Sequence, residues 1–356
     1  MKVLIIKLSA LGDVVQALPV AMAIRRQHPS ARVDWLVERP SAGLLVGHPA
    51  LSRVLISPRH ELSEDAIAAL PEVGTFLGRL RSTRYDAVLE LQGLIKSAIF
   101  ARLARSPRKI GFRGGKEPAA AWVLSEPLAA YDPERHALER YLDILEPLGV
   151  MRPARPEFGL EPDGEHLALA RQALGGHGQG RPLVVLHPVA KWESKLWPVG
   201  HWVELARLLA GQGLDLVLTG GPADRAQTAA IAQRSGAPVL DLAGRTELKV
   251  LAGVLKLADL AVCTDTGVMH LAAALATPVV ALFGPTSPGR TGPWGSGHTV
   301  LRLGLECSPC FRRACPAPRC LTGLTPGAAA AAVAERLGAK NRRRLEPPAG
   351  VANDWE

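Results

Sequence analysis

The sequence predicts an α/β protein made of two domains, each a doubly wound parallel sheet with helices on both faces. Short apolar or β-branched runs alternate with longer helical patterns, which is typical of βαβ units. The alternation stops where Pro, Gly and charged residues become frequent, from about Met151 to Arg181, and then restarts. A length of 356 residues also suits two domains of ordinary size.

The domain boundaries are predicted from these changes in composition. Residues 1–160 are expected to form the first domain and residues 182–335 the second, with an interdomain segment at 161–181. Residues 336–356 are expected to be a basic, flexible tail. Tandem open sheets bind ligands at the carboxyl ends of their strands, so a cleft between facing domains is the expected active site.

The individual elements can be assigned in chain order. In the first domain, strands are expected at Val3–Lys7, Arg32–Val37, Val54–Ile56, Ala87–Leu91 and Lys109–Phe112. In the second domain, strands are expected at Leu183–His187, Leu214–Thr219, Val239–Leu242, Leu260–Thr264 and Val279–Phe283. Helices are expected at Asp13–Gln27, at Leu94–Leu103, at Glu165–Leu174 and, rich in alanine, after Leu324.

The overall charge indicates an anionic partner. Lys and Arg number 42 against 33 Asp and Glu, a formal net charge of +9. Nucleic acid, phospholipid and a phosphorylated or carboxylated substrate all fit this charge, but no interleaving of aromatic and basic residues favours nucleic acid. The apolar run Val3–Ile6 is too short for a secretory signal, and no uncharged run reaches the ~20 residues of a membrane span. We therefore expect a cytoplasmic protein whose membrane contacts are peripheral.

A candidate ligand loop follows the first predicted strand, at Ser9–Asp13. Gly12 permits a tight turn and close backbone approach, and the helix that follows offers free N–H groups to an anion. The pattern Gly-x-Gly-x-x-Gly is absent after this strand, so the loop is not a dinucleotide fingerprint. Asp13 is either a helix-capping acid or a general base, and its spacing alone favours the cap.

A second candidate site is the segment Thr264–His270, at the end of a buried strand. Asp265, Thr266 and Gly267 fall at the strand end and helix start, where backbone N–H groups and a hydroxyl can hold a phosphate. His270 is expected to open a helix that extends to Leu275 and to add a donor one turn into it. Taken singly, a capping threonine and a half-buried histidine are the simpler interpretations.

Two other loops place charged side chains beyond strand ends in the second half. Lys195 lies in a segment rich in Pro and Trp, where it is either an ordinary solvated lysine or the group that neutralises a leaving diphosphate. Asp224 follows a glycine turn and either accepts ribose hydroxyls or caps the next helix.

Four of the cysteines fall in one Pro-containing loop, with the spacing Cys307-x2-Cys310-x4-Cys315-x4-Cys320. Four thiolates can close a tetrahedral zinc site or hold an iron–sulfur cluster, but this spacing is not that of a standard two-knuckle site. Reduced, structurally idle thiols are the favoured interpretation, and no histidine partner indicates catalysis. We therefore predict no metal and no cofactor.

Several short segments, in the right order, resemble the lipopolysaccharide heptosyltransferases of glycosyltransferase family 9. These segments are Lys7–Val14 with Leu18 and Pro19, Asp34–Glu38, Gln92–Ser97, Lys116–Pro118, Lys195–Pro198, Asp265–His270 and Phe283–Thr286. The resemblance spans roughly residues 1–335 and is strongest to the heptosyltransferase I type.

The resemblance implies a GT-B fold, with the acceptor on the first domain and the sugar nucleotide on the second. It implies an inverting, metal-independent transfer of heptose from ADP-L-glycero-D-manno-heptose to the Kdo-lipid A inner core of lipopolysaccharide. The absence of an Asp-x-Asp motif agrees with a metal-independent reaction. The acceptor implies peripheral association with the cytoplasmic face of the inner membrane and no nucleic-acid partner.

Carried onto this sequence, the resemblance assigns roles to individual residues. Asp13 matches the family's general base, which reverses the preference for a cap, and Lys195 is expected to stabilise the departing charge as the second catalytic residue. The expected donor-binding residues are Gly12, Asp224, Asp265, Thr266, Gly267, Val268 and His270. The expected acceptor-binding residues are Lys96, Ser97 and Lys116, for which a solvated basic face is the alternative.

The chain departs from the family pattern at two places. Val189 and Ala190 stand where hydroxyl residues are usual, and Lys116 stands where Arg is expected. Alternatives therefore stay open: a family 9 transferase with another core acceptor, of the heptosyltransferase II or III type, or a sugar-nucleotide epimerase or hydrolase on the same scaffold. A lipid- or nucleic-acid-binding module is suggested by the charge alone.

Overall fold

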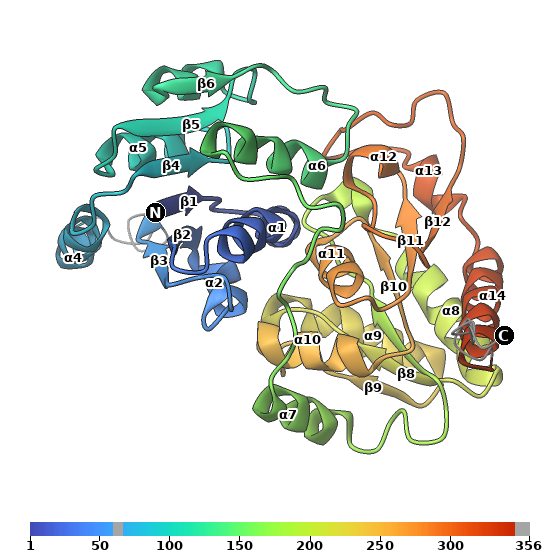
Figure 1. Ribbon diagram of the computed structural model, residues 1–356. Helices are drawn as coiled ribbons and strands as arrows, with labels where there is room; N and C mark the ends of the chain where they lie inside the picture. The colour runs from blue at the N-terminus through green and yellow to red at the C-terminus, as the bar shows by residue number, and fades with distance from the viewer. Residues whose placement is uncertain (60–66, 346–356) are drawn as a thin grey trace, which may run out of the picture. The chain divides into compact units, whose positions relative to one another are not determined.

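The computed structural model describes residues 1–59 and 67–345, which divide into two compact units. Unit 1 comprises Met1–Leu167 together with Glu247–Ala252 and Gly289–Gly292. Unit 2 comprises Ala168–Thr246, Gly253–Pro288 and the described residues from Pro293 onward. Each unit is built on its own six-stranded sheet with flanking helices (Figure 1).

All strand pairs of the unit 1 sheet are parallel, in the order β3-β2-β1-β4-β5-β6. The strands are β1 (Lys2–Ile6), β2 (Arg32–Glu38), β3 (Arg53–Ser57), β4 (Ala87–Glu90), β5 (Arg108–Phe112) and β6 (Glu126–Leu128). The helices are α1 (Leu11–Gln27), α2 (Arg39–Leu45), α4 (Leu70–Arg81), α5 (Ile95–Leu103) and α6 (Ala137–Leu142), with 3-10 helices η1 (Pro118–Val123) and η2 (Asp143–Leu148). Within the central strand β1, Ile5 pairs with Trp35 on one side and Leu89 on the other.

The unit 2 sheet is also parallel, in the order β12-β11-β10-β7-β8-β9. Its strands are β7 (Leu183–His187), β8 (Asp215–Leu218), β9 (Val239–Asp241), β10 (Leu260–Thr264), β11 (Val279–Phe283) and β12 (Thr299–Arg302). Its α-helices are α7 (Gly164–Leu174, which begins in unit 1), α8 (Val199–Gly211), α9 (Arg225–Ser235), α10 (Leu248–Leu257, shared between the units), α11 (Gly267–Ala274), α12 (Pro288–Thr291, also shared), α13 (Arg319–Thr322) and α14 (Pro326–Leu345). Two 3-10 helices, η3 (Glu193–Lys195) and η4 (Pro222–Asp224), follow β7 and β8.

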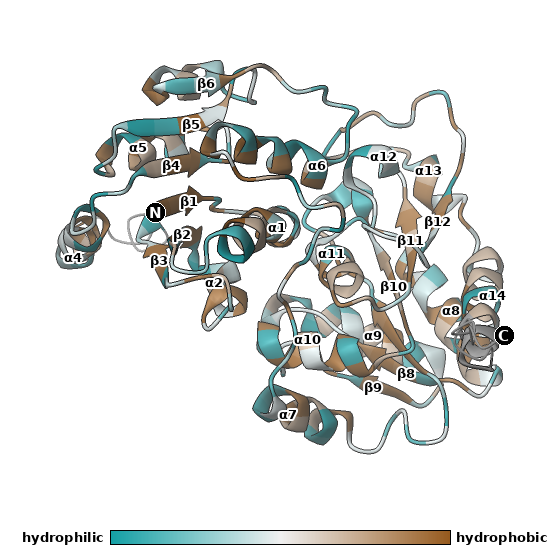
Figure 2. Ribbon diagram, viewed as in Figure 1, coloured by the Kyte–Doolittle hydropathy of each residue, from teal (hydrophilic) through white to brown (hydrophobic). Residues whose placement is uncertain are grey.

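The cores form because strands covered on both faces are apolar throughout. Every residue of β7, β10 and β11 is buried, and Trp197 and the α8 residue Trp202 belong to the buried cluster that packs against this sheet. In unit 1, β4 is likewise buried, and the central ribbons are the most hydrophobic in Figure 2.

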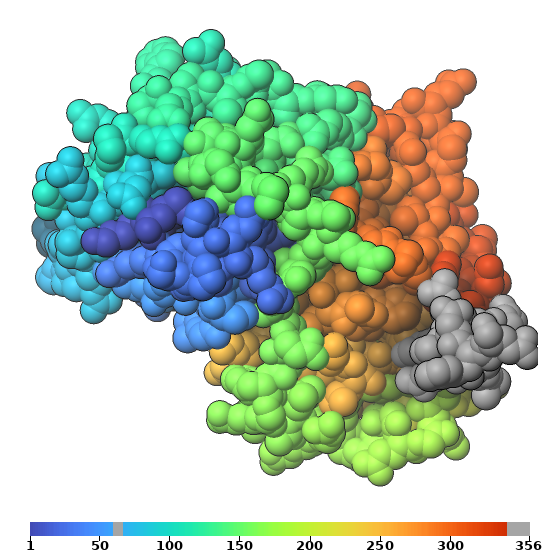
Figure 3. Space-filling view, in the orientation of Figure 1, coloured from blue at the N-terminus to red at the C-terminus, as the bar shows by residue number. Residues whose placement is uncertain are grey.

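Residues at the chain start and in α1, coloured blue, form part of the face that Figure 3 shows.

The predicted fold class, two doubly wound parallel sheets, is confirmed, and every predicted strand is present within a residue or two. Two edge strands, β6 and β12, were not predicted, since they are short and only partly buried, and β6 contains Pro127. The predicted start of a helix at His270 is wrong, because α11 begins at Gly267.

The alanine-rich helix expected after Leu324 is α14. It continues past Arg336 to Leu345, where a flexible tail was expected. The rest of that segment, residues 346–356, lies outside the described residues. Among the helices that the structure describes, none combines the length and the apolar character needed to cross a membrane.

Candidate active site

The candidate residues gather where the strand order of each sheet reverses. In unit 1 the central strand β1 lies between β2 and β4, and in unit 2 the central strand β7 lies between β8 and β10. Chain connections leave such a point in opposite directions, which opens a crevice beyond the carboxyl ends of the strands. The loops after β1 and β4, and after β7 and β10, therefore hold the side chains described below.

Asp13 lies in the first turn of α1, and its side chain is 38% exposed. Its Oδ2 accepts a 3.3 Å hydrogen bond from the Ala10 N–H, so the capping contact expected for a first-turn acid is present. The Tyr141 hydroxyl donates to the other oxygen, Oδ1, at 3.2 Å. The carboxylate is thus held from two sides and keeps a solvent-accessible surface, which suits a proton acceptor.

Lys7 forms the inner wall behind Asp13. Its ammonium group lies 3.8 Å from Asp13 Oδ2 and 4.8 Å from the centre of the Tyr141 ring, and it donates to the Leu91 carbonyl at 3.2 Å. Burial lowers the pKa of Lys7, although the charges of Asp13 and Glu90 offset part of that effect.

The loop after β4 fixes the loop after β1. Gln92 Oε1 accepts from the backbone N–H groups of Leu8 and Ser9, at 3.0 and 3.2 Å. Glu90, in turn, accepts from the N–H groups of Gln92 and Gly93. Burial raises the pKa of Glu90 despite these bonds, because desolvation disfavours its charged form.

The three predicted acceptor-binding residues occupy different environments. Lys96 donates to Glu38 Oε1 at 2.8 Å and reaches Ser9 Oγ at 3.4 Å, so it lies next to the Asp13 loop. Burial raises the pKa of Glu38, but bonds from Lys96 and Arg59 outweigh it and lower the pKa overall. Lys116 is exposed, whereas Ser97 is fully buried and donates to the Leu94 carbonyl, so Ser97 stabilises the start of α5 from inside.

In unit 2, Lys195 and Asp265 form a close ion pair between the loops after β7 and β10. The ammonium group donates to Asp265 Oδ2 at 2.7 Å, and the two side chains are 15% and 6% exposed. The same ammonium lies 4.5 Å from the centre of the Trp192 ring. The ammonium group of Lys195 has three donors, so it keeps donor capacity for a further anion.

The N-terminus of α11 has hydrogen-bond donors that suit an anion. Thr266 is the N-cap residue but makes no capping bond, and its buried hydroxyl has no partner within the described residues. Gly267 and the buried Val268 supply the first N–H groups of the helix. His270 is buried in the first turn, with Nε2 3.9 Å from Asp265 Oδ1.

The remaining predicted donor residues have structural contacts as well. Asp224 is the N-cap residue of α9, but its side chain makes no capping bond to that helix; instead its Oδ2 accepts from the Gly221 N–H at 2.7 Å. Gly12 is buried in the first turn of α1. His187, which sequence reasoning gave no role, ends β7 and bonds Thr219 Oγ1 through Nδ1 at 3.0 Å.

Burial determines the protonation state of the His187 imidazole at the end of β7. Desolvation lowers the pKa of His187 to about 4, against small opposing effects of Asp224 and Thr219. The ring is therefore neutral at physiological pH and adds no charge to the Lys195–Asp265 pair.

The cysteine loop packs against the loop that carries Lys195. Ser194 donates through its backbone N–H and its hydroxyl to the carbonyls of Arg313 and Arg312. Cys307 is exposed and Cys320 buried, and burial together with the neighbouring thiols raises the pKa of Cys320. In the described part of the chain, no group of three or more His, Cys, Asp or Glu side chains is arranged to hold a metal ion.

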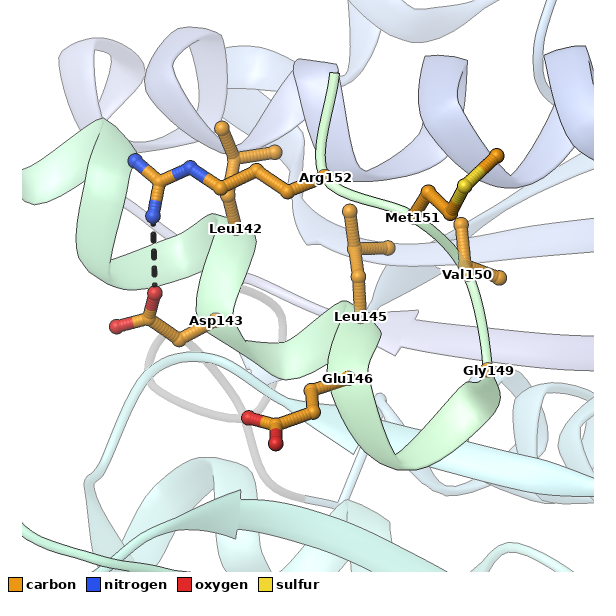
Figure 4. Close-up of a pocket in the computed structure, with 8 residues that line it drawn as sticks. All are labelled: Leu142, Asp143, Leu145, Glu146, Gly149, Val150, Met151 and Arg152. Carbon is orange, nitrogen blue, oxygen red and sulfur yellow. Dashed lines mark hydrogen bonds and ion pairs between the residues drawn. The ribbon is translucent and has the colours of Figure 1, made fainter. Parts of the chain in front are cut away.

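An open pocket lies elsewhere in unit 1, around η2 and the segment that follows it (Figure 4). Its lining is mostly apolar, with an Asp143–Arg152 ion pair at 3.1 Å at its edge. None of the predicted site residues lines this pocket, so the candidate site rests on the strand ends instead.

The model of glycosyltransferase family 9 (heptosyltransferase) matches residues 73–321. The chain belongs to this family. It is 33% identical to lipopolysaccharide heptosyltransferase 1 of Pseudomonas aeruginosa over 333 residues, which cover 88% of this chain and 87% of that protein. This family 9 member is therefore a glycosyltransferase, and the resemblance stated from its motifs is confirmed.

Two solved structures extend the likeness to three dimensions. The structure of E. coli heptosyltransferase WaaC with ADP has a TM-score of 0.78 and 29% sequence identity. The match covers 94% of this chain and 100% of that chain. The E. coli ADP-heptose lps heptosyltransferase II also has a TM-score of 0.78, with 25% identity, covering 96% and 100% of the two chains. WaaC has also been solved with ADP-2-deoxy-2-fluoro heptose. The family 9 scaffold, which is the GT-B fold implied by the motifs, is thus confirmed.

Proposed function

We propose that this glycosyltransferase moves heptose from ADP-L-glycero-D-manno-heptose to the Kdo-lipid A inner core of lipopolysaccharide. The relative from Pseudomonas aeruginosa is named a lipopolysaccharide heptosyltransferase 1, and WaaC is known with ADP and with an ADP-heptose analogue. The match to heptosyltransferase II supports the donor equally but not the acceptor. The preference for Kdo-lipid A therefore rests on the type 1 relatives.

The donor is proposed to bind at the strand ends of unit 2. Its diphosphate would receive hydrogen bonds from Lys195, from the unpartnered Thr266 hydroxyl and from the first N–H groups of α11, at Gly267 and Val268. His270 and Asp265 would contact the heptose. The free oxygen of Asp224 would accept a ribose hydroxyl, while its other oxygen holds the Gly221 turn.

The chemistry proposed is a single displacement with inversion. Asp13 takes the proton of an acceptor hydroxyl as that oxygen bonds to the anomeric carbon, and the bond from this carbon to the phosphate oxygen breaks. The electron pair leaves with ADP, whose added charge Lys195 and the α11 amides stabilise. A general base of this kind contributes typically ~10²- to 10⁴-fold to the rate. Gly12 lets the first turn of α1 approach the reactants closely.

The acceptor is proposed to bind unit 1 near Lys96 and Lys116, whose charges suit its phosphates and carboxylates. Lys96 supports this placement because it already bridges Glu38 and the Asp13 loop. The reaction is proposed to need no metal, since Lys195 supplies the positive charge and the sequence has no Asp-x-Asp motif. The proposed location is the cytoplasmic face of the inner membrane, where such a lipid acceptor is exposed.

The observation that carries the proposal is the Lys195–Asp265 pair beside an uncapped α11 and an unpartnered Thr266 hydroxyl. The test is incubation of the purified protein with ADP-heptose, with and without Kdo-lipid A, followed by mass measurement of the product. Addition of one heptose, unchanged by a chelator, is expected only with Kdo-lipid A. Transfer only to an already heptosylated core would show a type II acceptor, and donor breakdown without acceptor would show a hydrolase or epimerase.

A further inference from the structure

The solvent face of α5 is apolar where a surface helix is ordinarily polar. Its exposed positions are Ile95, Ile99 and Arg102, which recur at helical spacing and so share one face. Ile95 and Ile99 are 49% and 52% exposed. The opposite face of α5 packs in the core of unit 1, with Phe100 buried against the sheet. Two large aliphatic side chains therefore project from unit 1 without a role in its core.

A further exposed apolar side chain, Trp122, lies on the neighbouring 3-10 helix η1. The 3-10 helix η1 packs against α5, and its Val123 contacts the core cluster that contains Phe100. Trp122 itself is 87% exposed, the highest value among the large apolar side chains of the described residues. Tryptophan is favoured at membrane surfaces, because its ring is apolar while its N–H stays hydrated. We call Ile95, Ile99 and Trp122 the α5–η1 patch.

The two elements of the patch are fixed to each other. Glu117, just before η1, accepts a 2.6 Å hydrogen bond from the Ile95 N–H. Gly115 lies so close to Gly93 that a Cβ on it would stand 2.9 Å from the Gly93 carbonyl oxygen. Only glycine allows this approach, which seats the loop before η1 on the start of α5. The patch is therefore a preformed surface.

Three basic residues lie on α5 or in the loop that precedes η1. Arg102, Arg113 and Lys116 are exposed, and none of them forms an ion pair within the residues that the structure describes. Two other exposed arginines of unit 1 are paired, Arg26 with Glu157 and Arg59 with Glu38. Apolar side chains rimmed by unpaired cations match an anionic lipid surface, which offers both phosphates and an apolar interior.

We propose that the α5–η1 patch docks unit 1 onto an anionic lipid bilayer. Ile95, Ile99 and Trp122 enter the headgroup region, and Arg102 and Arg113 contact lipid phosphates. The inference rests on the proposed function in one respect, since a lipid-linked acceptor requires the enzyme to work at a membrane. It adds the surface that makes the contact: Lys96, on the same helix, then receives the acceptor's sugars while its lipid stays in the bilayer.

The test compares vesicle binding of the full-length protein and of the variant Ile95→Ser/Ile99→Ser/Trp122→Ser. We expect the unsubstituted protein to co-sediment with vesicles of phosphatidylglycerol and phosphatidylcholine at least tenfold more tightly than with pure phosphatidylcholine. The triple variant should lose at least tenfold of the affinity for the anionic vesicles. The matched control Val46→Ser/Met151→Ser, which removes exposed apolar side chains elsewhere on unit 1, should bind normally.

Charge is tested separately with Arg102→Glu/Arg113→Glu, against the control Arg79→Glu/Arg81→Glu on α4. The first pair should weaken binding to anionic vesicles at least tenfold and the second less than twofold. Equal vesicle binding by the unsubstituted protein and the triple variant would overturn the proposal. Absence of binding to either vesicle type would also overturn it and leave the patch to a protein partner.

A soluble, deacylated Kdo acceptor separates docking from catalysis. The triple variant should keep its kcat/KM on this acceptor, which shows that it is folded, and should lose at least tenfold on Kdo-lipid A in vesicles. Trp122→Ser alone provides a milder variant for the same pair of assays. Failure of the proposed function has a different signature: no transfer to the soluble acceptor by the unsubstituted protein, with vesicle binding intact.

Discussion

The two units share a sheet topology but carry opposite charge arrangements at the reversal point of the strand order. In unit 1, a buried cation, Lys7, lies behind a carboxylate, Asp13, that is 38% exposed. In unit 2, a buried carboxylate, Asp265, holds a lysine, Lys195. The more exposed member of each pair is thus an acid in unit 1 and an ammonium in unit 2.

This difference shows how one scaffold serves two chemical tasks. A buried charge is costly unless it is paired, so the buried member of each pair holds its partner close. In the proposed reaction, Asp13 of unit 1 is the proton acceptor and Lys195 of unit 2 is the cation that stabilises the departing anion. The topology explains where the site lies, and the choice of buried charge explains what each half can do.

The largest effect is expected where the unit 1 arrangement is broken. Asp13→Ala should lower kcat by about 10²- to 10⁴-fold, because the acceptor proton loses its base. The dissociation constant for ADP should change little, since the proposed donor contacts lie in unit 2. The measurement is steady-state kinetics together with calorimetric titration of ADP.

Asp13→Asn is the companion variant, because its amide can still accept from the Ala10 N–H. It should be as inactive as Asp13→Ala while retaining the thermal stability of the unsubstituted protein. Near-normal turnover by either variant would show that Asp13 only caps α1.

Removing the accessible cation of unit 2 should have the next largest effect. Lys195→Ala is expected to lower kcat by about 10²- to 10³-fold, comparable to the loss of one donor at a developing charge, and also to weaken ADP binding. Lys191→Ala, which removes an exposed lysine in the same loop, should leave both values unchanged.

Lys195→Ala also leaves the buried Asp265 carboxylate without the ammonium group that it pairs with. A loss of activity caused by this buried charge must therefore be distinguished from the loss of a catalytic group. In Lys195→Ala/Asp265→Asn the buried charge is gone. If this double variant recovers ADP affinity and turnover, Lys195 acts only by neutralising Asp265, and its catalytic assignment is wrong.

Much of the fold was predictable because its signals are local. Strands such as Leu183–His187 and Val279–Phe283 are continuous apolar runs, as sheets covered on both faces require. The two edge strands were not predicted, because Glu126–Leu128 and Thr299–Arg302 are half exposed and too short to show an alternation of apolar and polar residues. Both become strands by pairing with a strand elsewhere in the sequence, and a local sequence pattern does not predict such pairing.

The site was predictable only in part, for a similar reason. Asp13, Lys195 and Thr266 stand next to strand ends and glycine turns, so their positions could be inferred. Tyr141 reaches Asp13 across 128 sequence positions and carries no motif, so sequence reasoning missed it. Lys7 was part of a matching segment, but its burial, which gives it a role, is visible only in the structure.

A pH experiment tests the effect of burial on His187 in unit 2. His187 has a pKa lowered to about 4 from 6.5 by burial, so between these values the unfolded chain binds a proton that the folded chain excludes. The free energy of unfolding should therefore fall as pH decreases from about 6.5 to about 4, by up to about 3 kcal/mol from this group. Above pH 6.5 the group contributes no pH dependence.

The measurement is urea unfolding across this pH range for the unsubstituted protein and for His187→Asn. The amide can keep a hydrogen bond to Thr219 but does not titrate, so the variant's stability should depend less steeply on pH. His28→Asn, at an exposed position, is the control and should leave the slope unchanged. Parallel curves for His187→Asn and the unsubstituted protein would contradict the assignment.

The smallest effect is expected for the group that orients the base. Burial, reinforced by the charge of Asp13, raises the pKa of Tyr141 well above 10, so its hydroxyl stays protonated and donates to Asp13. Tyr141→Phe keeps the ring beside Lys7 but removes this bond, and a kcat about tenfold lower with an unchanged KM is expected. Tyr131→Phe, whose ring stacks with Arg140, should retain full activity. A rise in KM without loss of kcat would instead assign Tyr141 to substrate binding, because a positioning residue for the base acts on the chemical step.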